Sequence, residues 1–124
     1  MLGDHPVDVV LLSMKWEESR EFYSQRLGLE VIQQSDEAVS YRCGPTRLKV
    51  TKSTEGTKDS QTQASWRVED LRAELDQLAE RGVTPQDYDT DELKTVNGIA
   101  DQGEAWVAYL IDPDGNALGI EQPK

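Results

Sequence analysis

Histidine and cysteine, which often act as metal ligands or as catalytic residues, are scarce in this chain. Among its 124 residues there is one histidine, His5, and one cysteine, Cys43. A single histidine cannot supply the two-His-one-carboxylate set that non-haem iron oxygenases use. His5 lies near a terminus and is interpreted as solvent-exposed. Cys43 follows a strand-like run with no histidine nearby, so we interpret it as a packed strand residue, and a lone cysteine forms no intrachain disulfide.

Carboxylates, by contrast, are abundant. The chain has 24 Asp and Glu against 13 Lys and Arg, which gives a net charge of −11. Such a surface repels phosphate backbones and anionic lipid headgroups, so neither nucleic acid nor a membrane is expected as a partner. The longest apolar run near the N-terminus, residues 9–12, is too short for a signal-peptide core or a membrane span, and we expect a cytoplasmic protein.

The elements that must position any site follow one order twice: a strand, a helix that ends at a glycine, then three strands. The first copy is expected as a strand at 7–14, a helix at 16–27 before Gly28, and strands at 29–34, 37–43 and 47–52. The second is expected as a strand at 63–68, a helix carrying Leu71, Leu75 and Leu78 before Gly82, and strands at 106–111 and 117–122, with 83–88 and 98–100 as the candidates for the remaining strand.

This repetition predicts two similar halves that share one core. Residues 1–124 are expected to form a single domain, with a first module at about 6–53 and a second at about 63–122. The stretch between them, about 54–62, is rich in Ser, Thr and Lys and lacks apolar residues, which indicates a linker.

The order and spacing of three motifs resemble the vicinal oxygen chelate superfamily, which holds glyoxalases, bleomycin-resistance proteins and extradiol dioxygenases. The motifs are Phe22-Tyr23 with Leu27-Gly28-Leu29-Glu30-Val31, Val68-Glu69-Asp70-Leu71 with Arg81-Gly82-Val83, and Asp112-Pro113-Asp114-Gly115-Asn116. The resemblance implies an α+β fold, in which two βαβββ modules form an eight-stranded cup with the helices on its outer face. It also implies a homodimer, and a scaffold role for the last motif as the turn between the final two strands.

The resemblance also implies where a metal would bind. Metal-dependent relatives use His and Glu side chains from the first and last strand of each module, and the corresponding positions here are Asp8, Lys49, Gln63 and Gly119. Lysine is a cation, glycine has no side chain and glutamine is a weak oxygen donor. We therefore expect no metal ion and no other cofactor.

Alternate residues of a strand share one face, so placing Asp8 and Gln63 on the inner face of the cup places others there too. The candidate ligand-binding residues are Asp8, Val10, Leu12, Arg47, Lys49, Gln63, Ser65, Arg67, Tyr109 and Glu121. Three cations on one face of an acidic protein favour an anionic or carbonyl-containing ligand. Alternatively, the cations and carboxylates of this face only neutralise one another.

Two classes of function fit these residues. The first is a metal-independent binding protein, homodimeric, that sequesters a drug or metabolite in the cup. The second is a glyoxalase- or dioxygenase-like enzyme (a lyase, an isomerase or a ring-cleaving enzyme). It would be either metal-free with Asp8 or Glu121 as general base, or a metal enzyme whose ligand positions differ from those assigned above. The polar segment 89–103 is either a lid over the cup or a surface loop.

Overall fold

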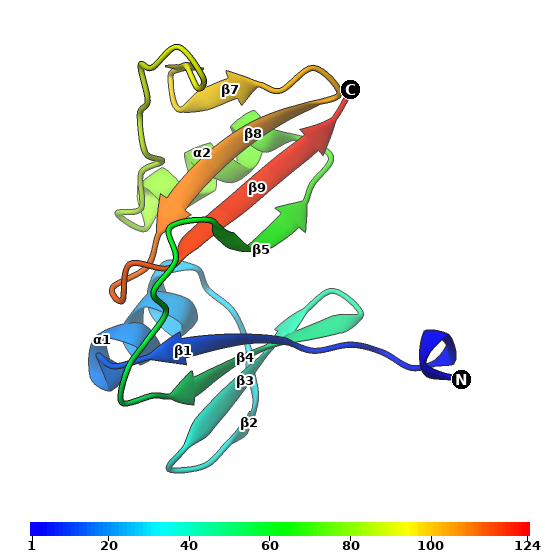
Figure 1. Ribbon diagram of the computed structural model, residues 1–124, viewed down its shortest axis with the longest axis vertical. Helices are drawn as coiled ribbons and strands as arrows, with labels where there is room; N and C mark the ends of the chain where they lie inside the picture. Colours follow the sequence, from blue (N-terminus) through cyan, green and yellow to red (C-terminus); the bar gives the residue numbers. More distant parts are fainter.

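Two β-sheets form the framework of the computed structural model, which describes residues 1–124. The first sheet has the strand order β1-β4-β3-β2, with β1 Val9–Ser13, β2 Val31–Gln34, β3 Ala38–Cys43 and β4 Thr46–Lys52. The second has the order β5-β9-β8-β7-β6, with β5 Thr62–Arg67, β6 Thr95–Val96, β7 Ile99–Asp101, β8 Ala105–Ile111 and β9 Ala117–Pro123. Figure 1 shows the second sheet above the first, with β1 and β5 as their facing edges.

Each sheet contains one parallel pair, β1 with β4 and β5 with β9, and its other pairs are antiparallel. Along the chain, a helix follows the first strand of each sheet, β1 or β5. These helices are α1 Trp16–Glu21, continued by the π-helical η2 Phe22–Arg26, and α2 Leu71–Glu80. A short 3₁₀ turn, η1 Leu2–Asp4, precedes β1 and stands clear of both sheets (Figure 1). The predicted α+β fold with two βαβββ modules is confirmed, with the short β6 as an extra strand.

A capping side chain and two glycines with positive φ set the ends of the helices. The Asp70 carboxylate accepts a hydrogen bond from the Ala73 amide (3.1 Å) and so caps α2 at its N-terminus. Leu71 and Leu75 are buried on the face that α2 turns to the sheet. Gly28 and Gly82 follow the two helices with φ of 70° and 79°, the left-handed conformation that ends a helix. No helix is long and apolar enough to cross a membrane.

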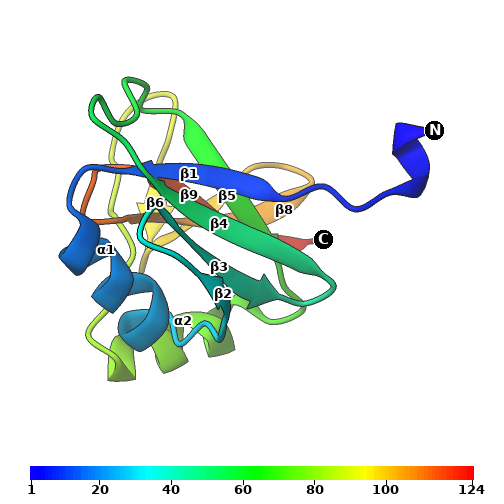
Figure 2. The ribbon, with the colours of Figure 1, turned by 90° about the horizontal axis from the view of Figure 1, so that it is seen from below.

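Both helices lie on the same side of the sheets (Figure 2), and the core fills the space between the two layers. Its 13 buried residues come from both modules and form one cluster: Leu11, Tyr23, Val39, Tyr41, Leu48, Val50, Leu71, Leu75, Val83, Ala108, Leu110, Leu118 and Ile120. In β4, the buried Leu48 and Val50 of this cluster alternate with more exposed residues, as the two-residue period requires. The core therefore joins the modules into one unit.

A buried polar network fastens the β8–β9 turn to the first module. Tyr23 donates its hydroxyl proton to Asp112 Oδ2 (2.7 Å), and Asn116 Nδ2 donates to the same oxygen (2.9 Å). The other oxygen of Asp112 accepts the amides of Asp114 (2.9 Å) and Asn116 (2.8 Å). Burial, and then the neighbouring charge of Asp112, raise the pKa of the Tyr23 phenol, so Tyr23 stays a hydrogen-bond donor.

Asp114, in the same turn, supplies the cap that α1 lacks. It accepts hydrogen bonds from Ser13 Oγ (2.6 Å) and from the amides of Met14 (2.7 Å) and Lys15 (2.9 Å). These groups lie directly before the first helical residue, and the N-cap residue of α1 makes no side-chain cap of its own. The predicted scaffold role of the turn is thus wider than a link between two strands, because the turn also holds module 1 against module 2.

The chain differs from expectation in the segment between α2 and β8. Residues 83–88 were predicted as a strand, but they form none. Pro85 has no amide proton to donate, and only the Gln86 amide bonds to β8, at Tyr109 O (2.8 Å). The polar segment 89–103 contains the β6–β7 hairpin, turned at Asn97 and Gly98, which both have positive φ. The middle of the segment therefore extends the second sheet, and its two ends are loops.

Candidate functional site

The candidate site is a cavity of about 390 Å³ between the β3–β4 turn and β5. It is lined by Val9, Cys43, Gly44, Pro45, Thr46, Arg47, Leu48, Ala64, Ser65, Trp66 and Arg67. Gly44 has a φ of 56°, which allows the tight turn, and Thr46 Oγ1 closes it with a hydrogen bond to the Cys43 carbonyl (2.8 Å). Both modules contribute to the lining, and three of the predicted ligand-binding residues, Arg47, Ser65 and Arg67, meet there.

Two guanidinium groups border this cavity, and each already has a carboxylate partner. Arg47 donates to both oxygens of Asp8, with Nη2 at 3.3 Å from Oδ2 and Nε at 3.4 Å from Oδ1. Arg67 Nε lies 3.8 Å from Glu121 Oε1. A guanidinium has five N–H groups, so both arginines retain free donors. Their side chains are 46% and 78% exposed, which leaves those donors accessible to a ligand.

The remaining predicted residues lie outside this cavity. Val10 is 54% exposed, and it pairs in register with Lys49 on β4, which makes no ion pair. Leu12 is half-buried further along β1. Gln63 is bonded to the Gln61 carbonyl (2.9 Å). Tyr109 packs edge-to-face against Tyr88, with ring centroids 5.8 Å apart.

Sequence reasoning missed the contribution of Cys43, Thr46 and Trp66 to the lining. The Gly44-Pro45 turn beside Arg47 was the available signal, because it brings the end of β3 next to the start of β4. Burial raises the pKa of the Cys43 thiol, and a hydrogen bond from Trp66 offsets this in part. A neutral thiol is a poor nucleophile, so Cys43 contributes packing and polarisability at the cavity wall and no nucleophile.

The residues at the family's metal positions do not fit a metal ion. Nowhere in the chain do three His, Cys, Asp or Glu side chains lie close enough together to share one. Asp8 is the only ionisable oxygen donor among the four positions, and it is engaged by Arg47. Gly119 has no donor, and a Cβ built there would meet Ser65 Oγ at 3.1 Å. No step of a mechanism is therefore assigned to a metal.

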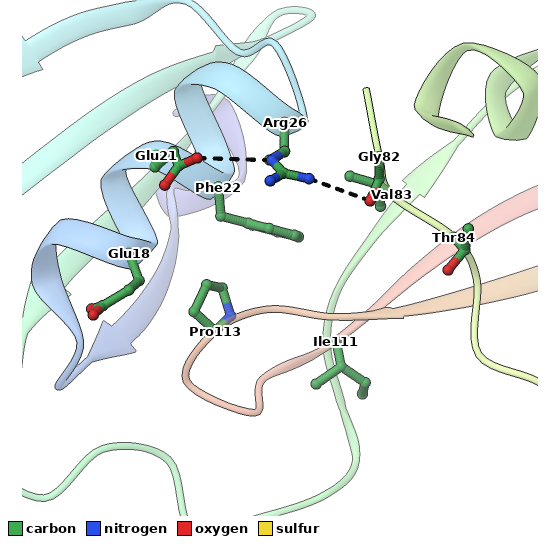
Figure 3. Close-up of a pocket in the computed structure, with 9 residues that line it drawn as sticks. All are labelled: Glu18, Glu21, Phe22, Arg26, Gly82, Val83, Thr84, Ile111 and Pro113. Carbon is green, nitrogen blue, oxygen red and sulfur yellow. Dashed lines mark hydrogen bonds and ion pairs between the residues drawn. The ribbon is translucent and has the colours of Figure 1, made fainter. Parts of the chain in front are cut away.

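A second cavity, of about 400 Å³, opens on the helix side between α1 and the second module (Figure 3). It is lined by Glu18, Glu21, Phe22, Arg26, Gly82, Val83, Thr84, Ile111 and Pro113. Arg26, its only cation, pairs with Glu21 (3.9 Å) and donates to the Gly82 carbonyl (3.4 Å). No predicted ligand-binding residue lies in this cavity. It is therefore a weaker candidate than the arginine-lined cavity.

Comparison with known proteins identifies the family. Residues 6–120 match the model of the Glyoxalase/Bleomycin resistance protein/Dioxygenase superfamily, and the chain belongs to that superfamily. No curated protein sequence matches the chain.

Solved structures share the fold at low sequence identity. A bleomycin-binding protein complexed with bleomycin is 19% identical, with a TM-score of 0.71 over 98% of this chain and 99% of that one. A glyoxalase/bleomycin resistance protein/dioxygenase from Alicyclobacillus acidocaldarius is 15% identical, with a TM-score of 0.75 over 97% and 92%. A lactoylglutathione lyase from Agrobacterium tumefaciens is 16% identical, with a TM-score of 0.66 over 95% and 92%.

Proposed function

We propose that this protein binds a small anionic or carbonyl-containing molecule through Arg47 and Arg67, without a metal ion. The observation that carries the proposal is the meeting of two guanidinium groups with free donors at one cavity. In a chain of net charge −11, these two arginines are the only charged residues among those that line the cavity. A drug or metabolite with a carboxylate or carbonyl group is the ligand class that such a site favours.

The cavity also offers contacts for the rest of such a ligand. Val9, Leu48 and Trp66 supply apolar wall, and Ser65 and Thr46 supply hydroxyl groups. Ligand sites usually combine an apolar lining with a few polar groups that fix orientation. Asp8 orients Arg47 through two hydrogen bonds before the ligand arrives, which reduces the side-chain entropy lost on binding.

We include a homodimer in the proposal. β2 and β6 are the outer edge strands of the two sheets, and edge strands are usually covered by another element or another chain. Val9 and Val10 on β1 are 38% and 54% exposed, which is apolar surface that pairing of two chains would bury. Sedimentation at micromolar concentration should return twice the mass of one chain. A single-chain mass across that range would refute the dimer and leave ligand binding to be judged separately.

A metal-free enzyme is the second candidate, because the Asp8 carboxylate is oriented by two hydrogen bonds from Arg47 beside the cavity. It would act as general base toward a bound carbonyl compound. Replacing Asp8 with Asn tests this role once a ligand is known. If Asp8 is a base, turnover of the ligand is lost while binding persists. If no product forms with the unsubstituted protein, the binding function stands alone.

The binding proposal is tested by ligand screening followed by arginine replacement. A thermal-shift screen of aromatic carboxylates and keto acids identifies a ligand, whose affinity is then measured by calorimetry. Arg47→Met and Arg67→Met should each weaken binding by about 5- to 30-fold, which corresponds to about 1–2 kcal/mol for a charge-assisted hydrogen bond at a partly exposed site. Arg42→Met is the matched control, since Arg42 pairs with Glu30 (3.1 Å) outside the cavity.

The same variants distinguish ligand binding from mutual neutralisation. If the arginines only balance Asp8 and Glu121, each replacement lowers thermal stability and leaves ligand affinity unchanged. That outcome would overturn the proposal.

A further inference from the structure

A third cavity, which no part of the proposed function uses, lies on the helix side where the two modules meet. Its volume is about 240 Å³, and it is lined by Leu27, Leu29, Trp66, Val68, Glu74, Leu78, Leu110 and Ile120. Leu27 and Leu29 flank Gly28 at the end of the first helix, Val68 directly follows β5, and the other residues belong to β5, α2, β8 and β9. The cavity is therefore built by both modules.

Contacts of Arg81 hold the end of the first helix in place next to two of the lining leucines. Gly28 contributes no side chain, and a Cβ there would lie 3.0 Å from Arg81 Cζ. The Arg81 guanidinium is itself held by the Gln25 carbonyl (2.8 Å), so it stays beside Gly28. The cavity is open to solvent on one side, so part of its apolar lining is in contact with water. An apolar molecule that covers this lining removes it from water, which favours binding.

The lining defines the chemistry of that molecule. Seven of the eight lining residues are hydrophobic, and the eighth, Glu74, is exposed and makes no ion pair within the chain. The apolar wall selects a hydrocarbon body, and the one unpaired carboxylate selects a cationic end. An apolar cavity of roughly 150 Å³ accepts benzene, so this one has room for a ring and a short chain.

We propose that this inter-module cavity binds a small apolar amine, with its ring or alkyl body against Trp66 and Leu78 and its ammonium group at Glu74. The site differs in chemistry from the arginine-lined cavity, and only Trp66 lines both. The proposal does not depend on the proposed function. Replacement of Arg47 or Arg67 should leave amine binding unchanged.

Three probes of similar size test the selection: 2-phenylethylamine, 2-phenylethanol and 3-phenylpropionate. Each is titrated into the full chain while the methyl NMR signals of Leu27, Leu29, Val68 and Leu78 are followed. The amine should shift these signals saturably and bind about 2- to 5-fold more tightly than the alcohol, the range of a partly exposed ion pair. The propionate should bind most weakly of the three.

Two charge variants of α2 form a matched pair. Glu74→Gln should remove the preference for the amine over the alcohol. Glu80→Gln, at another exposed position of the same helix, should keep it. A charge reversal, Glu74→Arg, should make the propionate the tighter ligand, and this exposed substitution does not disturb the core.

A volume variant supplies an independent test. Leu78→Trp fills the cavity and should abolish binding of all three probes; if it fails to fold, the charge reversal at Glu74 decides alone. Equal affinity of the unsubstituted protein for amine and propionate would overturn the proposal. So would methyl shifts that follow protein concentration without any probe, because a second copy of the chain would then cover the cavity.

Discussion

Replacing Tyr23 with Phe tests the account of how the two modules are joined. The change removes one hydroxyl and keeps the ring, which is fully buried against Phe22 and Tyr41. It deletes the 2.7 Å hydrogen bond to the Asp112 carboxylate, which is itself only 4% exposed. A buried hydrogen bond to a charged group contributes about 1.5–3 kcal/mol.

The expected loss lies near the lower half of that range, because Asp112 keeps three other donors from Asn116 and Asp114. We expect the free energy of unfolding to fall by about 2 kcal/mol, and Tm by about 8 °C for a chain of this length. Urea unfolding measures the change as a shift of the midpoint with an unaltered slope. Tyr88→Phe is the control, because the Tyr88 hydroxyl makes no hydrogen bond and its ring packs on Tyr109.

Tyr23→Phe should also change how the free energy of unfolding depends on pH in alkaline solution. Burial raises the pKa of Tyr23 above that of an unfolded tyrosine, which ionises near pH 10. Below about pH 10 the stabilisation is fully present, and it is lost as pH rises further because only the unfolded chain releases the proton. Above pH 10, Tyr23→Phe should lose stability less steeply than the unsubstituted protein. Two results together would refute this explanation: a fall in the free energy of unfolding of less than about 0.5 kcal/mol at neutral pH, and the same pH dependence for both proteins above pH 10.

Further predictions concern the junction and the cavity wall. Asp114→Ala should lower the free energy of unfolding by about 2 kcal/mol, because it removes one hydrogen bond from Ser13 at the end of β1 and two from the amides just before α1. Asp36→Ala in an exposed turn should leave the free energy of unfolding unchanged in the same urea titration. Gly82→Ala should cost at least about 1 kcal/mol, because φ is 79° and the new Cβ would lie 2.5 Å from Arg26 Nη1; an unchanged midpoint would contradict this. Cys43 should react slowly with a thiol-specific disulfide reagent at pH 7, because burial raises its pKa; a rate like that of free cysteine would show that its environment is misjudged.

The sequence predicted what depends on local spacing. The glycine after each helix, the leucine spacing of α2 and the two-residue alternation in β4 are short-range features, and the structure agrees with them. In β9 the predicted alternation is absent, because its first four residues are all buried. The predicted helix at 16–27 also forms, although its second half is a π-helix. The strand predicted at 83–88 was wrong because Pro85 removes a ladder donor, and β6 was missed because its two residues lie in a polar loop.

What the sequence could not predict depends on contacts between distant residues. Asp114 lies about a hundred positions from Ser13, so its role in capping α1 has no local signal. Likewise Arg47 and Ser65 belong to different sheets, and only the packing of the modules brings them to one cavity. The two-residue period of a strand placed Val10 and Lys49 on the same face as Arg47, but it does not predict where along the strands a cavity forms.

The most direct test of the central claim is a crystal structure of the protein with a carboxylate ligand identified by screening. The account predicts that the ligand lies between the β3–β4 turn and β5, with its carboxylate within hydrogen-bond distance of Arg47 and Arg67 and its apolar part against Trp66. A ligand bound elsewhere, with both arginines still paired only to Asp8 and Glu121, would contradict it.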